Sequence, residues 1–268
     1  MRPYPCMTTP DFAIAIMAAG KGTRLKSKRP KVLHEIGGSP LLLHVIAAAK
    51  KIVPADHIFC IIGHESDRVK AAVEHTGVQF VLQAEQRGTG HAIQMLKAFF
   101  TLNEAPLPKH LLVLSGDVPL IRPETIAAVR DIHLAEKATM TILTAVPADP
   151  TGYGRVLRLK PDAPEVTAII EQKSLSPAQL SAPEINSGIY CFETHALFSK
   201  LDSLAADVCG AEELDVGLDD GVGADGDFGV DDAGFGAEDG DACGHEAAGG
   251  GEAHGGVEVH HLGDGVRA

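Results

Sequence analysis

The sequence predicts an α/β protein in which helices flank a sheet. Apolar runs of strand length alternate with segments of helical periodicity between residues 12 and 146. The runs are continuous rather than alternating with polar residues, as expected for strands that are covered on both faces. Short breaks at glycine and proline separate the segments, so we expect right-handed crossovers between strands.

Each element follows from a local pattern. The first strand, 12–16, runs into small residues and glycine, and Pro40 at a first-turn position opens a helix that ends at Lys50 and Lys51. Pro123 opens another helix, which continues to about Ala135. Further strands are expected at 57–63, 78–83, 111–114 and 140–146, and further helices at 66–75 and 92–100.

The pattern changes after Asp149 to short, hairpin-like strands. These are expected at 155–157, 166–170 and 189–192. We predict that they form a small lobe over the sheet.

Residues 205–268 differ in kind from the rest. They hold 17 acidic residues and one basic residue, whereas residues 1–204 hold 22 Lys and Arg against 19 Asp and Glu. Of these 64 residues, 52 are Ala, Gly, Asp, Glu or Val, whose codons all begin with G. We hypothesise a reading-frame shift near Leu204 in a GC-rich gene; the absence of a sensible protein in the other frames would contradict it. The composition predicts disorder.

Composition also excludes several classes of protein. The first 204 residues are close to neutral and the chain has 4% aromatic residues, so nothing indicates a nucleic-acid partner. No segment reaches the roughly 20 apolar residues of a membrane helix. Residues 1–11 are expected to be a leader; a secretory signal is the alternative, but the apolar run continues directly into basic residues. Five widely separated cysteines indicate reduced thiols and a cytoplasmic protein.

The stretch 17–25 predicts a loop that grips phosphate. Two glycines after a buried strand allow backbone amides to approach an anion closely, and Arg24 and Lys31 add positive charge. The spacing fits neither the dinucleotide fingerprint nor the P-loop motif, so a plain tight turn is the alternative.

Polar side chains follow two later strands. Gln83, Gln86 and Thr89 offer uncharged groups that suit the edge of a neutral base, with a surface turn as the alternative. Asp117 follows a buried strand and either caps a turn or holds Mg²⁺, which prefers oxygen ligands. Ligands of such sheets bind outside the carboxyl ends of the strands, so we expect one shared site.

Six motifs occur in order over residues 12–204. They are Ala18 to Arg24 with Pro30 to Leu33, Gln83 to Ala92, Gly116 to Leu120, Asp149 to Arg155, Glu171 to Lys173, and Glu184 to Gly188. Together they closely resemble the uridylyltransferase half of the bacterial bifunctional enzyme that makes UDP-N-acetylglucosamine. The resemblance implies a nucleotide-diphospho-sugar transferase fold, a Rossmann-like mixed sheet with a β-rich sugar-binding lobe. It also implies the reaction of UTP with N-acetylglucosamine 1-phosphate, with release of pyrophosphate.

The resemblance also implies roles for residues of this chain. Arg24 and Lys31 would be catalytic and grip the phosphates, and Asp117 would bind Mg²⁺. The nucleotide would be held by Ala18, Ala19, Gly20, Gly22, Gln83, Gln86, Gly88 and Thr89, and the sugar by Gly154, Glu171 and Asn186.

The chain departs from the family after about residue 204. The family continues with Gly-Glu-Tyr-Tyr-Leu-Thr-Asp and with Gly-Val-Asn, whose Asn is a second metal ligand, and neither is present. We expect a nucleotidyltransferase domain over 12–204 that is incomplete at its C-terminus, without acetyl transfer and without the family's trimer, hence a monomer. A transferase for another sugar or for molybdopterin, and an inactive nucleotide-binding fragment, are the alternatives.

Overall fold

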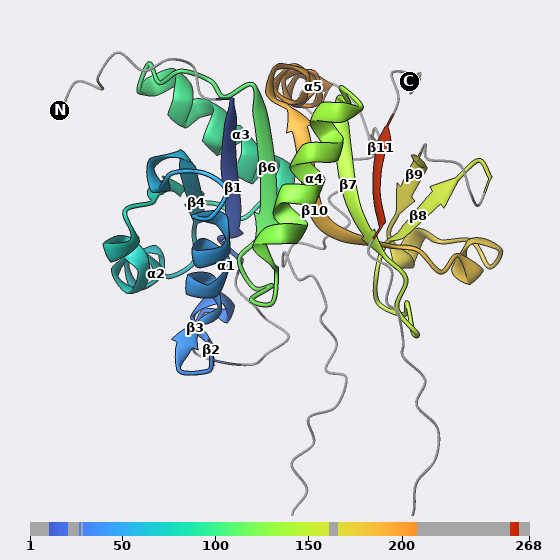
Figure 1. The fold of residues 1–268 in the computed structure, drawn as a ribbon, viewed down its shortest axis with the longest axis horizontal. Coiled ribbons are helices and arrows are strands. Elements are labelled where there is room, and N and C mark those ends of the chain that lie inside the picture. The colour runs from blue at the N-terminus through green and yellow to red at the C-terminus, as the bar shows by residue number, and fades with distance from the viewer. Residues whose placement is uncertain (1–10, 21–26, 28, 161–165, 208–257, 263–268) are drawn as a thin grey trace, which may run out of the picture.

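The computed structural model describes residues 11–20, 27, 29–160, 166–207 and 258–262. Its centre is a mixed sheet in the strand order β11-β7-β10-β6-β1-β4-β5 (Figure 1). The strands β1 (Phe12–Ala18), β4 (Ile58–Ile62), β5 (Gln79–Leu82) and β6 (His110–Ser115) are parallel to one another. The fold class expected from the sequence is therefore confirmed.

Helices cover both faces of the sheet because side chains alternate along its strands. In β1, Ile14 and Ile16 pack with α1 (Leu41–Ala49), α2 (Ser66–Val73) and α4 (Pro123–Ala135). Ala13 and Ala15 of the same strand face α3 (Gly88–Leu102) and α5 (Thr194–Asp207). Each face thus has its own apolar core, which explains the continuous apolar runs in the sequence.

The strand β10 (Ile185–Glu193) differs from the expectation that 189–192 belongs to the lobe. It lies in the main sheet, antiparallel to both β6 and β7 (Met140–Ala145). The physical reason is burial, since Ile189 and Cys191 join the core on one face and Phe192 joins the core on the other. The lobe contains β8 (Arg155–Arg158) and β9 (Val166–Ile170), which join β10 where Ile185 pairs with Arg155.

Several short elements complete the described chain. The hairpin β2 (Glu35–Ile36) and β3 (Ser39–Pro40) precedes α1, and β11 (Glu258–Leu262) pairs antiparallel with β7. The sequence did not lead us to expect α5 or β11. The 3-10 helices are Lys31–Leu33 (η2), Ala55–His57 (η3), Glu74–Thr76 (η4), Gln172–Ser174 (η5) and Gln179–Ser181 (η6).

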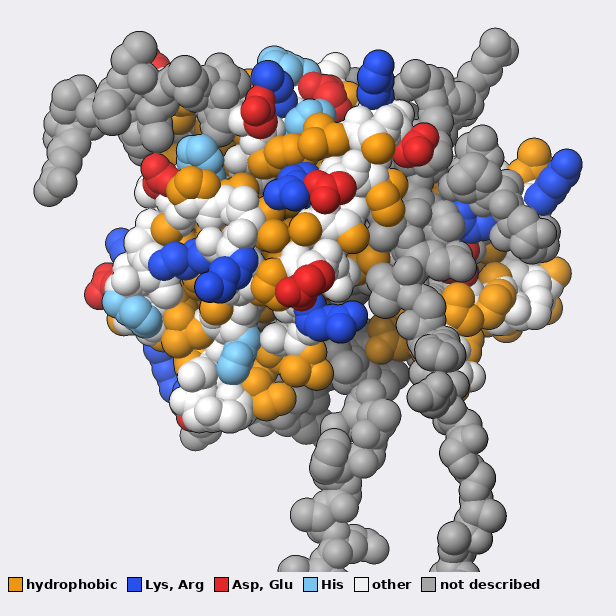
Figure 2. Space-filling view, in the orientation of Figure 1, with side chains coloured by type: hydrophobic (Ala, Val, Ile, Leu, Met, Phe, Trp, Pro, Cys, Tyr) orange, Lys and Arg blue, Asp and Glu red, His pale blue; other side chains and the backbone are white. Residues whose placement is uncertain are grey.

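The surface carries charges of both signs. On the face shown in Figure 2, the coloured Lys and Arg side chains lie among Asp and Glu side chains. Within the described residues, no helix is both long enough and apolar enough to cross a membrane.

Candidate functional site

The site is built on the edge at which the parallel strands end. Ala18 pairs with Ile62, which pairs with Leu82, and on the other side Met17 pairs with Ser115. The loops after β1, β4, β5 and β6 therefore leave the sheet at neighbouring positions. Parallel strands bring their carboxyl ends together in this way, which is why ligands bind there.

The loop after β1 is described only in part. Ala18 and Ala19 are buried, and the backbone of His64 donates a 3.3 Å hydrogen bond to the carbonyl oxygen of Ala19. After Gly20 the structure describes the segment again at Ser27 and from Arg29 onward. Gly22 and Arg24 lie outside the described residues, so their predicted roles stay predictions.

Gln83 is almost completely buried at the end of β5, with 3% of its surface exposed. Its Nε2 donates to the carbonyl oxygen of Gly88 at 3.0 Å and lies 3.2 Å from Nδ1 of His91. Both contacts involve the amide nitrogen, so the amide oxygen is the group that Gln83 can offer to a base. Thr89 follows in the first turn of α3.

Two glycines allow these loops to pack closely. A Cβ at Gly63 would lie 2.8 Å from the carbonyl oxygen of Gln83 and 2.8 Å from Nε2 of Gln86. A Cβ at Gly116 would lie 2.7 Å from the carbonyl oxygen of Met17. Gly63 was not among the site residues predicted from the sequence, because its close approach depends on packing between separate loops.

The charged centre of the edge is the pair formed by Lys31 and Asp117. Lys31 Nζ lies 2.9 Å from Asp117 Oδ2, and their side chains are 18% and 7% exposed. The hydroxyl of Ser115 donates a short hydrogen bond to Asp117 Oδ1. Lys31 comes from η2, so tertiary structure brings it to the end of β6.

The fit to Mg²⁺ rests on the single carboxylate of Asp117. Among the described residues, no group of three His, Cys, Asp or Glu side chains is placed to hold a metal ion. Mg²⁺ is commonly held by one or two carboxylates together with substrate phosphates, so the single carboxylate of Asp117 fits this ion.

The predicted sugar-binding residues meet at the junction of lobe and sheet. The backbone of Asn186 donates to the carbonyl oxygen of Gly154 at 2.9 Å, and a Cβ at Gly154 would lie 2.9 Å from Glu171 Oε1. Tyr190 pairs with Val113 in antiparallel register, so Asn186 lies toward the carboxyl end of β6, on the same side as Asp117. All three predicted residues are therefore close together. They lie beside the edge of the sheet that carries Lys31 and Asp117.

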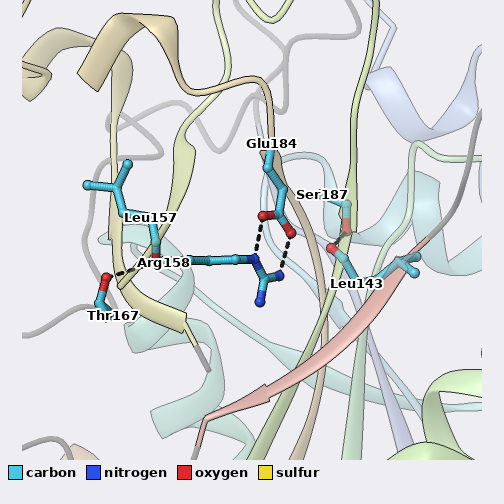
Figure 3. Close-up of polar contacts among 6 residues, drawn as sticks. All are labelled: Leu143, Leu157, Arg158, Thr167, Glu184 and Ser187. Carbon is cyan, nitrogen blue, oxygen red and sulfur yellow. Dashed lines mark hydrogen bonds and ion pairs between the residues drawn. The ribbon is translucent and has the colours of Figure 1, made fainter. Parts of the chain in front are cut away.

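A buried ion pair holds the lobe to the sheet (Figure 3). Arg158 of β8 binds Glu184 through two hydrogen bonds, of 2.7 Å from Nε and 2.6 Å from Nη2. The two side chains are 6% and 13% exposed. Since Glu184 comes shortly before Asn186, the pair fixes the register between the lobe and the start of β10.

Comparison with known proteins identifies the family. The MobA-like NTP transferase domain matches residues 14–184. The chain belongs to this family. It is 56% identical over 202 residues to the bifunctional protein GlmU of Koribacter versatilis (strain Ellin345), with 75% of this chain and 42% of that protein covered. Against GlmU of Lactococcus lactis subsp. cremoris (strain MG1363) the identity is 45% over 196 residues, with coverages of 73% and 41%.

These matches confirm the resemblance to the uridylyltransferase half of the bifunctional family, and the chain spans about two fifths of the length of these curated relatives. Two solved structures share the fold of this chain. Mannose-1-phosphate geranyltransferase from Thermus thermophilus aligns with a TM-score of 0.56 at 22% identity, covering 75% of this chain and 65% of that chain. A putative glucose-1-phosphate thymidylyltransferase from Bacillus anthracis aligns with a TM-score of 0.55 at 20% identity, covering 75% and 79%.

Proposed function

We propose that the chain is a nucleotidyltransferase that joins UTP and N-acetyl-α-D-glucosamine 1-phosphate, giving UDP-N-acetylglucosamine and pyrophosphate, a precursor step in peptidoglycan and lipopolysaccharide synthesis. The observation that carries the proposal is that Gln83, at the end of β5, and the Lys31–Asp117 pair, at the end of β6, lie at the same edge of the sheet, where the parallel strands end. Membership of the NTP transferase family and the match to GlmU support it.

The chemistry needs positioning and positive charge more than covalent help. A phosphate oxygen of the sugar phosphate attacks the α-phosphorus of UTP in line, a new P–O bond forms, and the bond to the β-phosphate breaks as pyrophosphate leaves. Lys31 and Arg24 offset the charge that develops on the phosphates. Gln83, Gln86, Gly88 and Thr89 hold the nucleotide with the β1 loop, and Gly154, Glu171 and Asn186 hold the sugar.

Asp117 would hold Mg²⁺ together with phosphate oxygens of the substrate. When bound, this ion supplies charge neutralisation for the phosphates. Replacing Asp117 with Asn keeps the shape of the side chain but removes its charge, and we expect it to weaken the binding of Mn²⁺, used as a spectroscopic substitute, as well as turnover.

The direct test is release of pyrophosphate by the full chain with Mg²⁺, UTP and N-acetylglucosamine 1-phosphate. Formation of UDP-N-acetylglucosamine in equal amount supports the proposal. Retained binding of UTP without pyrophosphate release would favour an inactive nucleotide-binding fragment instead.

A transferase for another base is the second candidate, because the matching domain is described as MobA-like. A molybdopterin guanylyltransferase would use GTP. Parallel assays with UTP and GTP separate the two functions.

We also propose that the protein works in the cytoplasm. Cys60 and Cys191 are buried free thiols, which suit a reducing compartment. Burial raises the pKa of Cys60 to about 12, which favours the protonated thiol over the nucleophilic thiolate.

A further inference from the structure

The strand β10 contains a bulge that brings Asn186 and Tyr190 together. Asn186 pairs with Thr144 of β7, and Tyr190 pairs with Ile142, with a register shift between Asn186 and Ile189. Thr144 and Ile142 are two positions apart and point to the same face of the sheet. Asn186 and Tyr190 therefore lie as same-face neighbours, although four positions separate them in sequence.

The bulge directs two hydrogen bonds to one atom. The backbone of Gly188 and the hydroxyl of Tyr190 each donate a 2.9 Å hydrogen bond to Asn186 Oδ1. Gly188 has a φ of 71°, which glycine adopts without strain. Beside it, Ser187 Oγ donates to the carbonyl oxygen of Leu143, and both residues are labelled in Figure 3. An amide oxygen has two acceptor sites, so both sites of Oδ1 are occupied.

This arrangement fixes which end of the amide a ligand can use. Oδ1 is committed to the protein, so Nδ2 is the group of Asn186 left to donate to a bound molecule. Tyr190 keeps its proton and its donor role, because burial raises the pKa of its hydroxyl far above the ordinary value. The hydrogen bond to Asn186 opposes this rise in pKa, and the Glu171 carboxylate adds to it.

We infer that Tyr190 is a positioning residue, which orients the Asn186 amide so that Nδ2 donates to a hydroxyl or acyl oxygen of the sugar phosphate. The inference rests on the proposed function, in which Asn186 binds the sugar. The ring of Tyr190 is held independently of its hydroxyl, since it packs beside Phe192 with ring centroids 5.6 Å apart. Tyr190→Phe should therefore remove the hydrogen bond and leave the packing.

The test is a double-mutant cycle in the full chain, with KM measured separately for N-acetylglucosamine 1-phosphate and for UTP. Loss of one hydrogen bond is worth about 1 kcal/mol, so Tyr190→Phe should raise KM for the sugar phosphate by roughly 5- to 10-fold and leave KM for UTP unchanged. In an Asn186→Ala background the same change should alter KM by less than about 2-fold, because Tyr190 acts through Asn186.

Thr194→Val provides the matched control. Thr194 is completely buried, and its hydroxyl has no partner among the described residues, so this variant also removes one buried hydroxyl. It should leave both KM values unchanged. Thermal unfolding of all variants shows whether each one folds.

Two results would overturn the inference. One is an unchanged sugar-phosphate KM in Tyr190→Phe while the wild type turns over normally, which would leave the proposed function intact. The other is an equal effect of Tyr190→Phe with and without Asn186, which would indicate a general structural role. If the wild type releases no pyrophosphate but binds the sugar phosphate in calorimetry, the proposed function fails. The inference about Tyr190 is then tested by comparing the Kd of the sugar phosphate, in place of KM, across the same variants. Absence of both turnover and binding would contradict both proposals.

Discussion

Lys31 Nζ lies 2.9 Å from Asp117 Oδ2, and this ion pair joins the segment before α1 to the end of β6. Both side chains are mostly buried, so the pairing compensates part of the cost of burying their charges. In the proposed reaction, the same two groups face the phosphates. The ion pair stabilises the packing at this edge of the sheet, and the proposed function gives the same two side chains a role in the chemistry.

Replacing Lys31 with Met should lower turnover by about 10²- to 10³-fold, because one preorganised charge that stabilises the transition state is lost. It should also lower the free energy of unfolding by about 2 kcal/mol, since the buried Asp117 carboxylate loses a charged partner. Steady-state kinetics and urea unfolding measure the two effects. Lys109→Met is the control, because Lys109 pairs with Asp11 on the exposed surface, and it should leave turnover unchanged. Normal turnover in Lys31→Met would refute the catalytic role.

Replacing Gly63 with Ala should distort the nucleotide site. The new methyl group would meet the backbone oxygen of Gln83 at 2.8 Å, so the backbone after β5 must shift. We expect a KM for UTP about 10-fold higher and a loss of about 1 to 2 kcal/mol in stability. Gly90→Ala is the stability control, since a Cβ there meets nothing within 4 Å, and this change should not lower stability. Unaltered UTP kinetics in Gly63→Ala would show that this contact does not shape the site.

A histidine pair that contains the buried His133 should make stability depend on pH. His110 Nδ1 lies 3.1 Å from His133 Nε2, and His133 Nδ1 lies 2.9 Å from the Thr141 hydroxyl. Burial, and then the neighbouring His110, lower the pKa of His133 to about 4, although the Glu193 carboxylate opposes the shift. Burial also lowers the pKa of His110, while Glu193 and Asp11 oppose that shift and Lys109 adds to it.

The direction in which stability changes with pH follows from proton binding. Below a pH of about 6.5 the unfolded chain binds a proton at His133 that the folded chain does not bind, so stability falls as the pH decreases toward 4. The loss from His133 should reach about 3 kcal/mol. Urea unfolding between pH 7 and 4.5 measures it, and His133→Gln should flatten the slope whereas the exposed His75→Gln should not. An equal slope in both variants would assign the dependence to other groups.

Removing the Arg158 side of the lobe's ion pair should weaken both stability and sugar binding. Arg158→Met leaves the buried Glu184 carboxylate without its bidentate partner, and such a change costs about 3 kcal/mol. The KM for the sugar phosphate should rise because Glu184 adjoins the start of β10. The control is Arg68→Met, since Arg68 pairs with Glu65 at the surface and should contribute less than about 1 kcal/mol. Identical urea midpoints for the two variants would contradict the prediction.

The sequence by itself determined most of the local elements and the family. The helix at Pro123–Ala135 begins and ends where the pattern predicts, and the strands of the parallel part follow from their apolar runs. Polar residues after β5 and β6 were correctly expected at one edge, because parallel strands end together. These features depend on neighbours in sequence, which periodicity and turn residues report directly.

Tertiary structure alone decided the contacts between distant segments. No local pattern indicated that β10 inserts between β6 and β7, because the pairing of separated strands depends on how the whole sheet assembles. The contact of Lys31 with Asp117, the closeness of Gly63 to Gln83, and the bond from Tyr190 to Asn186 all follow from the assembled sheet and from the bulge in β10. Each is set by packing in three dimensions, where a shift of one residue in register would separate the groups.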